Sequence, residues 1–180
     1  VAVRYKPPVP TSPWVEYDRP AAATVVCEHL VACGYRRIGF IGSLPDAEHP
    51  TTHKFDAFAA VLHGHGLDIH ARHVGVAYEK PGEAFSAVLA MIRRRDLPDA
   101  FFVDTDYKAM EVVKALRDHG LRVPDDIGIA GYDDVQEAAH FDPPLTTVYT
   151  VRREIGRHAA ETLRTMAPAG GTLLQPELRV

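Results

Sequence analysis

Apolar positions along the chain switch repeatedly between two spacings. Short apolar runs such as Ile127–Ala130 are partly β-branched and indicate strands covered on both faces. Other apolar residues recur at helical spacing, as Phe55, Phe58, Ala59 and Leu62 do. Strands are expected at residues 1–5, 37–41, 74–78, 100–103, 127–130, 146–149 and 172–178. Helices are expected from residue 20 and over residues 55–62, 81–95, 107–119, 135–140 and 152–166.

Strands that alternate with helices of this length predict an α/β fold. Such helices allow successive strands to run parallel, and they cover both faces of the sheet. Pro20 suits the first turn of the first helix, and Gly34 suits its end. We therefore expect a doubly wound parallel sheet, preceded by a proline-rich connector that leads to Trp14–Asp18.

Composition and charge narrow the classes of function. The 180 residues are 46% hydrophobic and carry a net charge of −4, whereas a duplex-binding domain usually has a basic face. No apolar run is long enough for a membrane span, and the first residues lack a secretory apolar region. Cys27 and Cys33 fall on different faces of one expected helix, which favours reduced thiols and a cytoplasmic location.

The segment Val123–Thr147 combines several informative signals. Pro124 ends the preceding element, and an apolar strand leads into Gly131–Asp134, which places two carboxylates just past the carboxyl end of that strand. Ligands of open α/β sheets bind at this edge. Pro143 and Pro144 then close the segment before the next strand.

This segment resembles the effector-binding core of the lac-repressor (LacI/GalR) family of bacterial transcription regulators. Gly120–Pro124, Gly131–Asp134 and Pro144–Val148 match the family pattern in order and spacing. The resemblance continues upstream in Glu28–Gly42 and downstream in Arg153–Leu163, so it covers nearly the whole chain. It implies a periplasmic-binding-protein-like fold of type I.

The resemblance also implies how the chain is divided. Family members have a helix-turn-helix headpiece and then a core of two lobes. Residues 1–18 would be the end of the first lobe and the crossover, and residues 19–144 would be the second lobe. Residues 145–180 would form a return segment, with a helix toward the first lobe and a final strand toward the second. The chain is thus expected to be a half-core that lacks the headpiece and most of the first lobe.

The first aspartate of Gly-Tyr-Asp-Asp commonly binds the effector in this family, which implies that role for Asp133. The alternative is that Asp133 or Asp134 caps the following short helix, and capping is the main role expected of Asp134. Thr105 stands where the family usually has an asparagine that contacts the ligand, and its hydroxyl offers one donor instead of two. Asp106 is a second ligand candidate, with helix N-capping as its alternative role.

Lys54 stands where the family has an arginine that reaches the ligand, and it lacks the planar fork of arginine. Its alternative is a solvated lysine on the outer face of a helix. Tyr78 ends a strand at the same edge, where the family places an aromatic residue on the ligand; a core or rim tyrosine is equally expected. Arg152 replaces an aromatic contact of some members and is expected to be a surface arginine.

The resemblance further implies a homodimer, with Met110, Val113 and Phe141 as apolar contacts. The expected partners are a small-molecule effector, such as a sugar or related polar metabolite, and operator DNA bound through the headpiece. No membrane partner is expected. A sugar solute-binding protein of a transport system is the alternative, although the run Pro144–Val148 favours the regulator.

An enzyme is a further alternative on a doubly wound sheet, because fold alone does not define function. The serines do not lie in a nucleophile motif, and Gly39–Ser43 lacks a dinucleotide fingerprint. The histidines between residues 63 and 73 lack metal-ligand spacing. The acids at the strand ends fit helix capping or hydroxyl binding better than magnesium. We therefore expect no catalytic residue, no metal and no cofactor.

Overall fold

The computed structural model describes residues 2–3, 12–44, 53–78, 80–165 and 168–180. Its largest sheet has four parallel strands in the order β4-β3-β5-β6. These strands are β3 (Ile38–Gly42), β4 (Val74–Val76), β5 (Ala100–Val103) and β6 (Gly128–Ala130). They occur where the short apolar runs predict them, and their carboxyl ends meet at one edge of the sheet.

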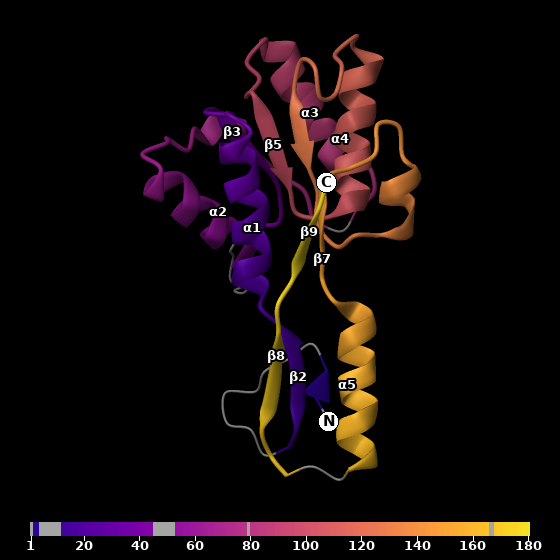
Figure 1. Ribbon diagram of the computed structural model, residues 1–180. Helices are drawn as coiled ribbons and strands as arrows, with labels where there is room; N and C mark the ends of the chain where they lie inside the picture. The colour runs from indigo at the N-terminus through magenta and orange to yellow at the C-terminus, as the bar shows by residue number, and fades with distance from the viewer. Residues whose placement is uncertain (1, 4–11, 45–52, 79, 166–167) are drawn as a thin grey trace.

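Helices cover both faces of this sheet (Figure 1). One face carries α1 (Arg19–Ala32) and α2 (His53–Gly64), and the other carries α3 (Glu83–Arg94) and α4 (Asp106–Asp118). Asp18 begins α1, since its carboxylate accepts a hydrogen bond from the Ala21 N–H at 2.9 Å. The doubly wound parallel sheet is thereby confirmed. Two 3₁₀ turns complete this part, η1 (Ala71–His73) and η2 (Gln136–His140).

Alternate residues of β5 build the two cores. Phe102 faces α1 and α2, where its ring centroid lies 5.6 Å from that of Phe40 and 6.4 Å from that of Phe58. Phe101 and Val103 face α3 and α4. All three residues of β5 named here are fully buried, as the two-residue period of a strand covered on both faces requires.

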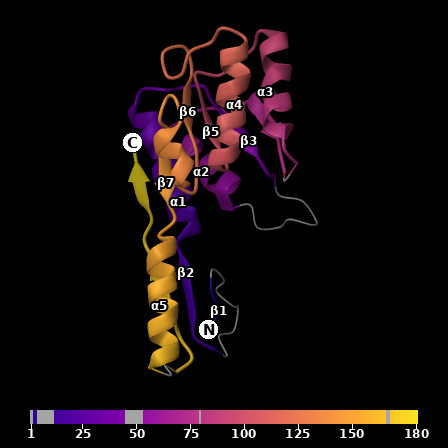
Figure 2. The ribbon, with the colours of Figure 1, turned by 90° about the vertical axis from the view of Figure 1, so that its right-hand side faces the viewer.

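A second, smaller body lies below the large sheet (Figures 1 and 2). It consists of the parallel strands β1 (Ala2–Val3), β2 (Trp14–Tyr17) and β8 (Gly171–Leu174), against which α5 (Arg152–Arg164) packs. We call it the smaller lobe, and we call the four-stranded sheet with its helices and the β7/β9 pair the larger lobe. In that pair, β7 (Thr147–Tyr149) runs antiparallel to β9 (Glu177–Arg179). The chain crosses between lobes three times, before α1, before α5 and between β8 and β9.

Two expectations for single elements were wrong. The one strand expected over residues 172–178 is two strands, β8 in the smaller lobe and β9 beside β7. Pro176 interrupts it, because proline has no N–H to give to a strand ladder. Trp14–Tyr17, expected only as the end of a connector, is a buried strand that pairs on both sides.

Candidate functional site

The carboxyl ends of β3, β5 and β6 bring Gly42, Asp104 and Gly131 to one edge of the larger lobe. A Cβ atom at Gly42 would lie 2.3 Å from the Asp104 side chain, so glycine is needed for the two strands to end this close together. The Asp104 carboxylate accepts a hydrogen bond from the Ser43 N–H at 2.8 Å and pairs with the Lys108 ammonium at 2.8 Å. The negative charge of Asp104 is therefore paired within the protein.

Asp133 and Asp134 form a left-handed turn at this edge, with φ angles of 109° and 50°. Such angles cost an ordinary residue about 1–2 kcal/mol, and aspartate tolerates them better than most. The Asp133 N–H donates to the Val148 carbonyl at 3.1 Å, and the Asp134 N–H donates to the Thr147 hydroxyl at 3.2 Å. Tertiary contacts thus hold the turn that presents the Asp133 side chain.

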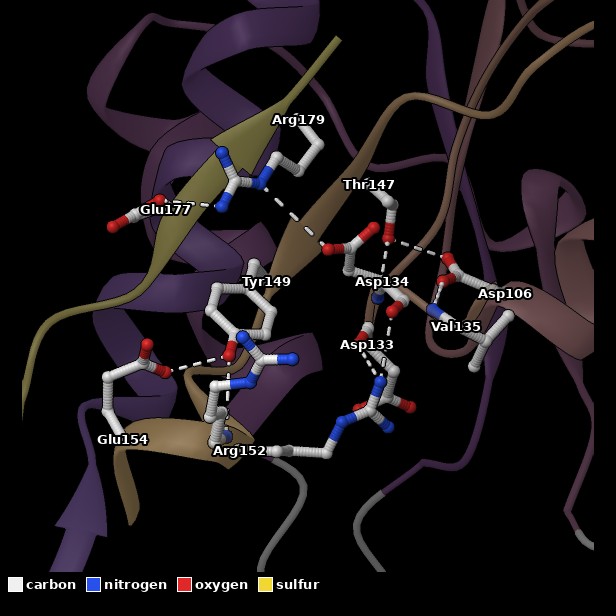
Figure 3. Close-up of polar contacts among 11 residues, drawn as sticks. Asp106, Asp133, Asp134, Val135, Thr147, Tyr149, Arg152, Glu154, Glu177 and Arg179 are labelled. Carbon is white, nitrogen blue, oxygen red and sulfur yellow. Dashed lines mark hydrogen bonds and ion pairs between the residues drawn. The ribbon is translucent and has the colours of Figure 1, made fainter. Parts of the chain in front are cut away.

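Asp134 does not cap the short helix η2, so that expectation was wrong. Val135 occupies the N-cap position, and η2 has no side-chain cap there. The Asp134 carboxylate lies 3.9 Å from the Arg179 guanidinium on β9 instead (Figure 3). The Asp134 side chain therefore faces β9.

Asp106 lies beneath the turn and is completely buried. Its carboxylate accepts hydrogen bonds from the Val135 N–H at 2.9 Å and from the Thr147 hydroxyl at 2.6 Å (Figure 3). Burial raises the pKa of Asp106 to about 6, against the opposing effect of these hydrogen bonds. A Cβ atom at Gly131 would lie 2.2 Å from the Asp106 carboxylate, so the close approach needs glycine. Asp106 therefore supports the turn of Asp133 and Asp134 from beneath.

Thr105, and not Asp106, is the N-cap of α4. The Thr105 hydroxyl accepts a hydrogen bond from the Lys108 N–H at 3.4 Å, and Asp106 is the first helical residue. Threonine and aspartate both favour this position, so the sequence leaves a one-residue ambiguity in where the helix starts. Because the Thr105 hydroxyl oxygen accepts in this contact, its O–H can still donate a hydrogen bond.

Lys54 reaches the same edge from the start of α2. Its ammonium lies 4.0 Å from the centroid of the Tyr132 ring and donates a hydrogen bond to the Asp104 carbonyl. Burial lowers the pKa of Lys54, while the charges of Asp133 and Asp104 oppose that shift. Lys54 is thus a partly buried cation beside the Asp133 turn, which excludes the alternative of a fully solvated lysine.

A cavity of about 850 Å³ opens at this edge. Tyr78, Thr105 and Asp133 line one part of it, so the structure brings together three of the five candidate ligand residues. Lys54 and Asp106 are not among the residues that line it. The Tyr78 N–H donates to the Glu83 carboxylate at 2.7 Å, which fixes the backbone at the cavity rim.

The same cavity continues along α4 to Met110 and Phe141, which are two of the three residues expected at a dimer contact. The third, Val113, is only 2% exposed and packs in the core between α3 and α4. The expectation of a surface role for Val113 does not fit this position, because its side chain already faces the sheet. Tyr107, which the sequence did not single out, is 59% exposed on the same stretch of α4.

Sequence reasoning missed the roles of two side chains, those of Thr147 and Arg152, that shape the site. Thr147 joins Asp106 to the turn, and Arg152 donates hydrogen bonds to the backbone of the turn. Because both act through backbone or buried partners far apart in sequence, no local motif signals them. Among the described residues, no three His, Cys, Asp or Glu side chains gather as a metal site would require. In the same part of the chain, no helix is both long and apolar enough to cross a membrane.

Known proteins share this architecture. Residues 27–180 match the family described as periplasmic binding protein-like domain. The HTH-type transcriptional repressor PurR of Haemophilus influenzae (strain PittEE) is 31% identical over 137 residues, covering 76% of this chain. The chain spans 40% of the length of that relative.

Solved structures show the same fold. A LacI family transcriptional regulator from Mycobacterium smegmatis superposes with a TM-score of 0.78 at 26% identity, over 93% of this chain and 64% of that one. The transcriptional regulator CelR in complex with cellobiose gives a TM-score of 0.79 at 24% identity, over 96% of this chain and 54% of that one. The chain belongs to the periplasmic binding protein-like domain family and forms an effector-binding core of the LacI/GalR type.

Proposed function

We propose that the chain senses a small polar effector, such as a sugar, and thereby controls operator DNA binding by a helix-turn-helix headpiece outside these 180 residues. The relatives are named transcriptional repressors, and a protein of the same fold holds cellobiose. The net charge of −4 supports DNA contact elsewhere than in this chain. This role needs no catalysis, metal or cofactor, and it places the protein in the cytoplasm.

The observation that carries the proposal is that Asp133 lines a cavity at the carboxyl edge of a parallel sheet. A carboxylate accepts hydrogen bonds from two neighbouring hydroxyls, which is the pattern that a sugar offers. Thr105 and Tyr78 add a hydroxyl and an aromatic ring in the same cavity. Lys54 adds a cation close to Asp133, while Asp106 supports the turn from beneath.

The proposed regulatory step is a change in the relative angle of the two lobes. We assign residues 19–144 to the second lobe, residues 1–18 to the end of the first lobe and the crossover, and residues 145–180 to the return segment. An effector that contacts both lobes shifts their relative angle only by its differential affinity for the two arrangements. The three chain crossings between the lobes are the segments that would bend.

We expect Asp133→Asn to weaken sugar binding by about ten- to a hundredfold, because hydrogen bonds to a charged acceptor contribute about 1.5–3 kcal/mol. Asparagine tolerates the left-handed backbone at this position, so the turn is kept. Chemical-shift titration with neutral mono- and disaccharides, cellobiose included, measures the affinity. Asp125→Asn, on an acid whose side chain is 60% exposed and paired with Arg122, is the matched control. Equal affinities of the Asp133 variant and the wild type would exclude Asp133 as the anchor.

We also propose a homodimer through the surface formed by Met110 on α4 and Phe141 at the end of η2. Met110→Lys is expected to weaken dimerisation at least about tenfold, because a charge would be buried against an apolar partner surface. Sedimentation velocity over a range of concentrations measures the change. Val76→Lys, at a 46% exposed position on β4, should leave the dimer intact. A Met110 variant that dimerises like the wild type would rule out this face.

A further inference from the structure

Arg152 extends from the first residue of α5 to the backbone of the Asp133 turn. One nitrogen of its guanidinium, Nη2, donates hydrogen bonds to the Asp133 carbonyl at 2.8 Å and to the Asp134 carbonyl at 3.0 Å (Figure 3). Two successive carbonyl groups therefore share one donor nitrogen, which fixes both peptide planes of the turn. Arg152 is exposed, as the sequence led us to expect of a surface arginine early in a helix, and these contacts give it a structural role in addition.

Arg152 lies where the two lobes join, at the first residue of α5. α5 packs against β2 and β8 of the smaller lobe, whereas the turn follows β6 of the larger lobe. The start of α5 is itself held, because the Tyr149 hydroxyl donates to the Glu154 carboxylate at 2.7 Å and accepts from the Arg153 N–H at 3.3 Å. Both contacts tie the start of α5 to Tyr149 of β7 in the larger lobe, so Arg152 is held beside the turn.

The turn needs such support because both of its residues have positive φ angles. The N–H groups of Asp133 and Asp134, and that of the following residue Val135, are held from the larger lobe by the Val148 carbonyl, the Thr147 hydroxyl and the Asp106 carboxylate, respectively. The carbonyl groups of Asp133 and Asp134 are held by Arg152. The direction of the Asp133 side chain follows from the orientation of these peptide planes.

We propose that Arg152 is a positioning residue that orients the Asp133 side chain by holding the two carbonyl groups of its turn. The functional meaning of this contact rests on the proposed role of Asp133 in effector binding. The planar guanidinium suits this role, because it holds two acceptors in a fixed geometry, whereas a lysine ammonium is a flexible point donor.

Amide hydrogen exchange, followed by NMR in the 180-residue chain without ligand, tests the proposal. In Arg152→Ala, the amides of Asp133, Asp134 and Val135 are expected to exchange about three- to tenfold faster, as the loss of exposed hydrogen bonds predicts. The amides of β5 report global stability and should keep their rates. Arg152→Lys should restore part of the protection, because its ammonium can also donate to the carbonyl groups but lacks the planar guanidinium geometry.

Arg153→Ala is the matched control, since Arg153 is the adjacent exposed arginine and meets Tyr149 through its backbone N–H. It should leave the three turn amides unchanged. Unchanged turn amides in Arg152→Ala, equal effects in the two alanine variants, or equal acceleration of the β5 amides would each overturn the proposal. The measurement uses no ligand, so its failure would leave effector binding by Asp133 untouched, and a failure of Asp133 to bind sugars would not alter its result.

Discussion

Phe102→Ala is expected to lower the free energy of unfolding by about 3–5 kcal/mol, as truncation of a buried aromatic residue does. Phe102 is fully buried in the central strand β5. Its ring contacts those of Phe40, Phe58 and Tyr132, with centroid distances of 5.6, 6.4 and 6.4 Å. Helices α1 and α2 cover this cluster, so little relaxation can fill the cavity.

Urea denaturation of the wild type and the variant measures this change. Leu173→Ala is a suitable control, because Leu173 is 46% exposed on β8 and its truncation leaves no closed cavity. The control should stay within about 0.5–1 kcal/mol of the wild type. A loss below about 1 kcal/mol for Phe102→Ala would show that the aromatic cluster does not form the main core.

Asp106→Asn is expected to gain stability relative to the wild type as the pH rises. Asp106 has a folded pKa of about 6, raised from 3.8 by burial. The folded state therefore holds this proton more tightly than the unfolded state, and the wild type loses stability as the pH rises through the window between the two values. The full effect is about 3 kcal/mol, of which about 2 kcal/mol falls between pH 4.5 and 7.5.

The asparagine variant does not ionise. Its amide oxygen can accept from the Val135 N–H, and its amide nitrogen can donate to the Thr147 hydroxyl, which reverses the wild-type hydrogen bond in which that hydroxyl donates. The difference between the unfolding free energies of variant and wild type, measured at both pH values, isolates Asp106 from the other acids. Asp125→Asn, on an acid whose side chain is 60% exposed, is the matched control. A pH-independent difference for Asp106→Asn would mean that Asp106 titrates normally.

The sequence was sufficient to predict the sheet and its helices, because helical and strand periods alternate clearly in the second-lobe segment. The prediction was wrong where partners lie far apart in sequence. Trp14–Tyr17 becomes a strand only because β1 and β8 flank it, and its proline-rich neighbourhood hides this pairing. The spacing of Val113 predicts an inward side chain and the family resemblance implies a dimer contact, and the structure places it in the core on the α3 and α4 side of the sheet.

In the candidate site, too, the sequence predicts what local order determines and not what distant partners determine. Asp133, Thr105 and Tyr78 follow strand ends, so sequence order alone predicts that they gather at one edge. The different tasks of Asp106 and Asp133 cannot be read from sequence, because both are strand-end acids. Burial and the contacts with Val135 and Thr147 separate the supporting acid from the acid that lines the cavity.

The central claim is that the strand-end edge of the larger lobe binds a polar effector. Chemical-shift mapping of the isotopically labelled chain, titrated with neutral mono- and disaccharides that include cellobiose, tests it most directly. The account predicts saturable shifts that centre on the amides of Lys54, Thr105 and Asp133. A panel without saturable shifts, or shifts that centre on His73 and Asp96 away from this edge, would contradict it.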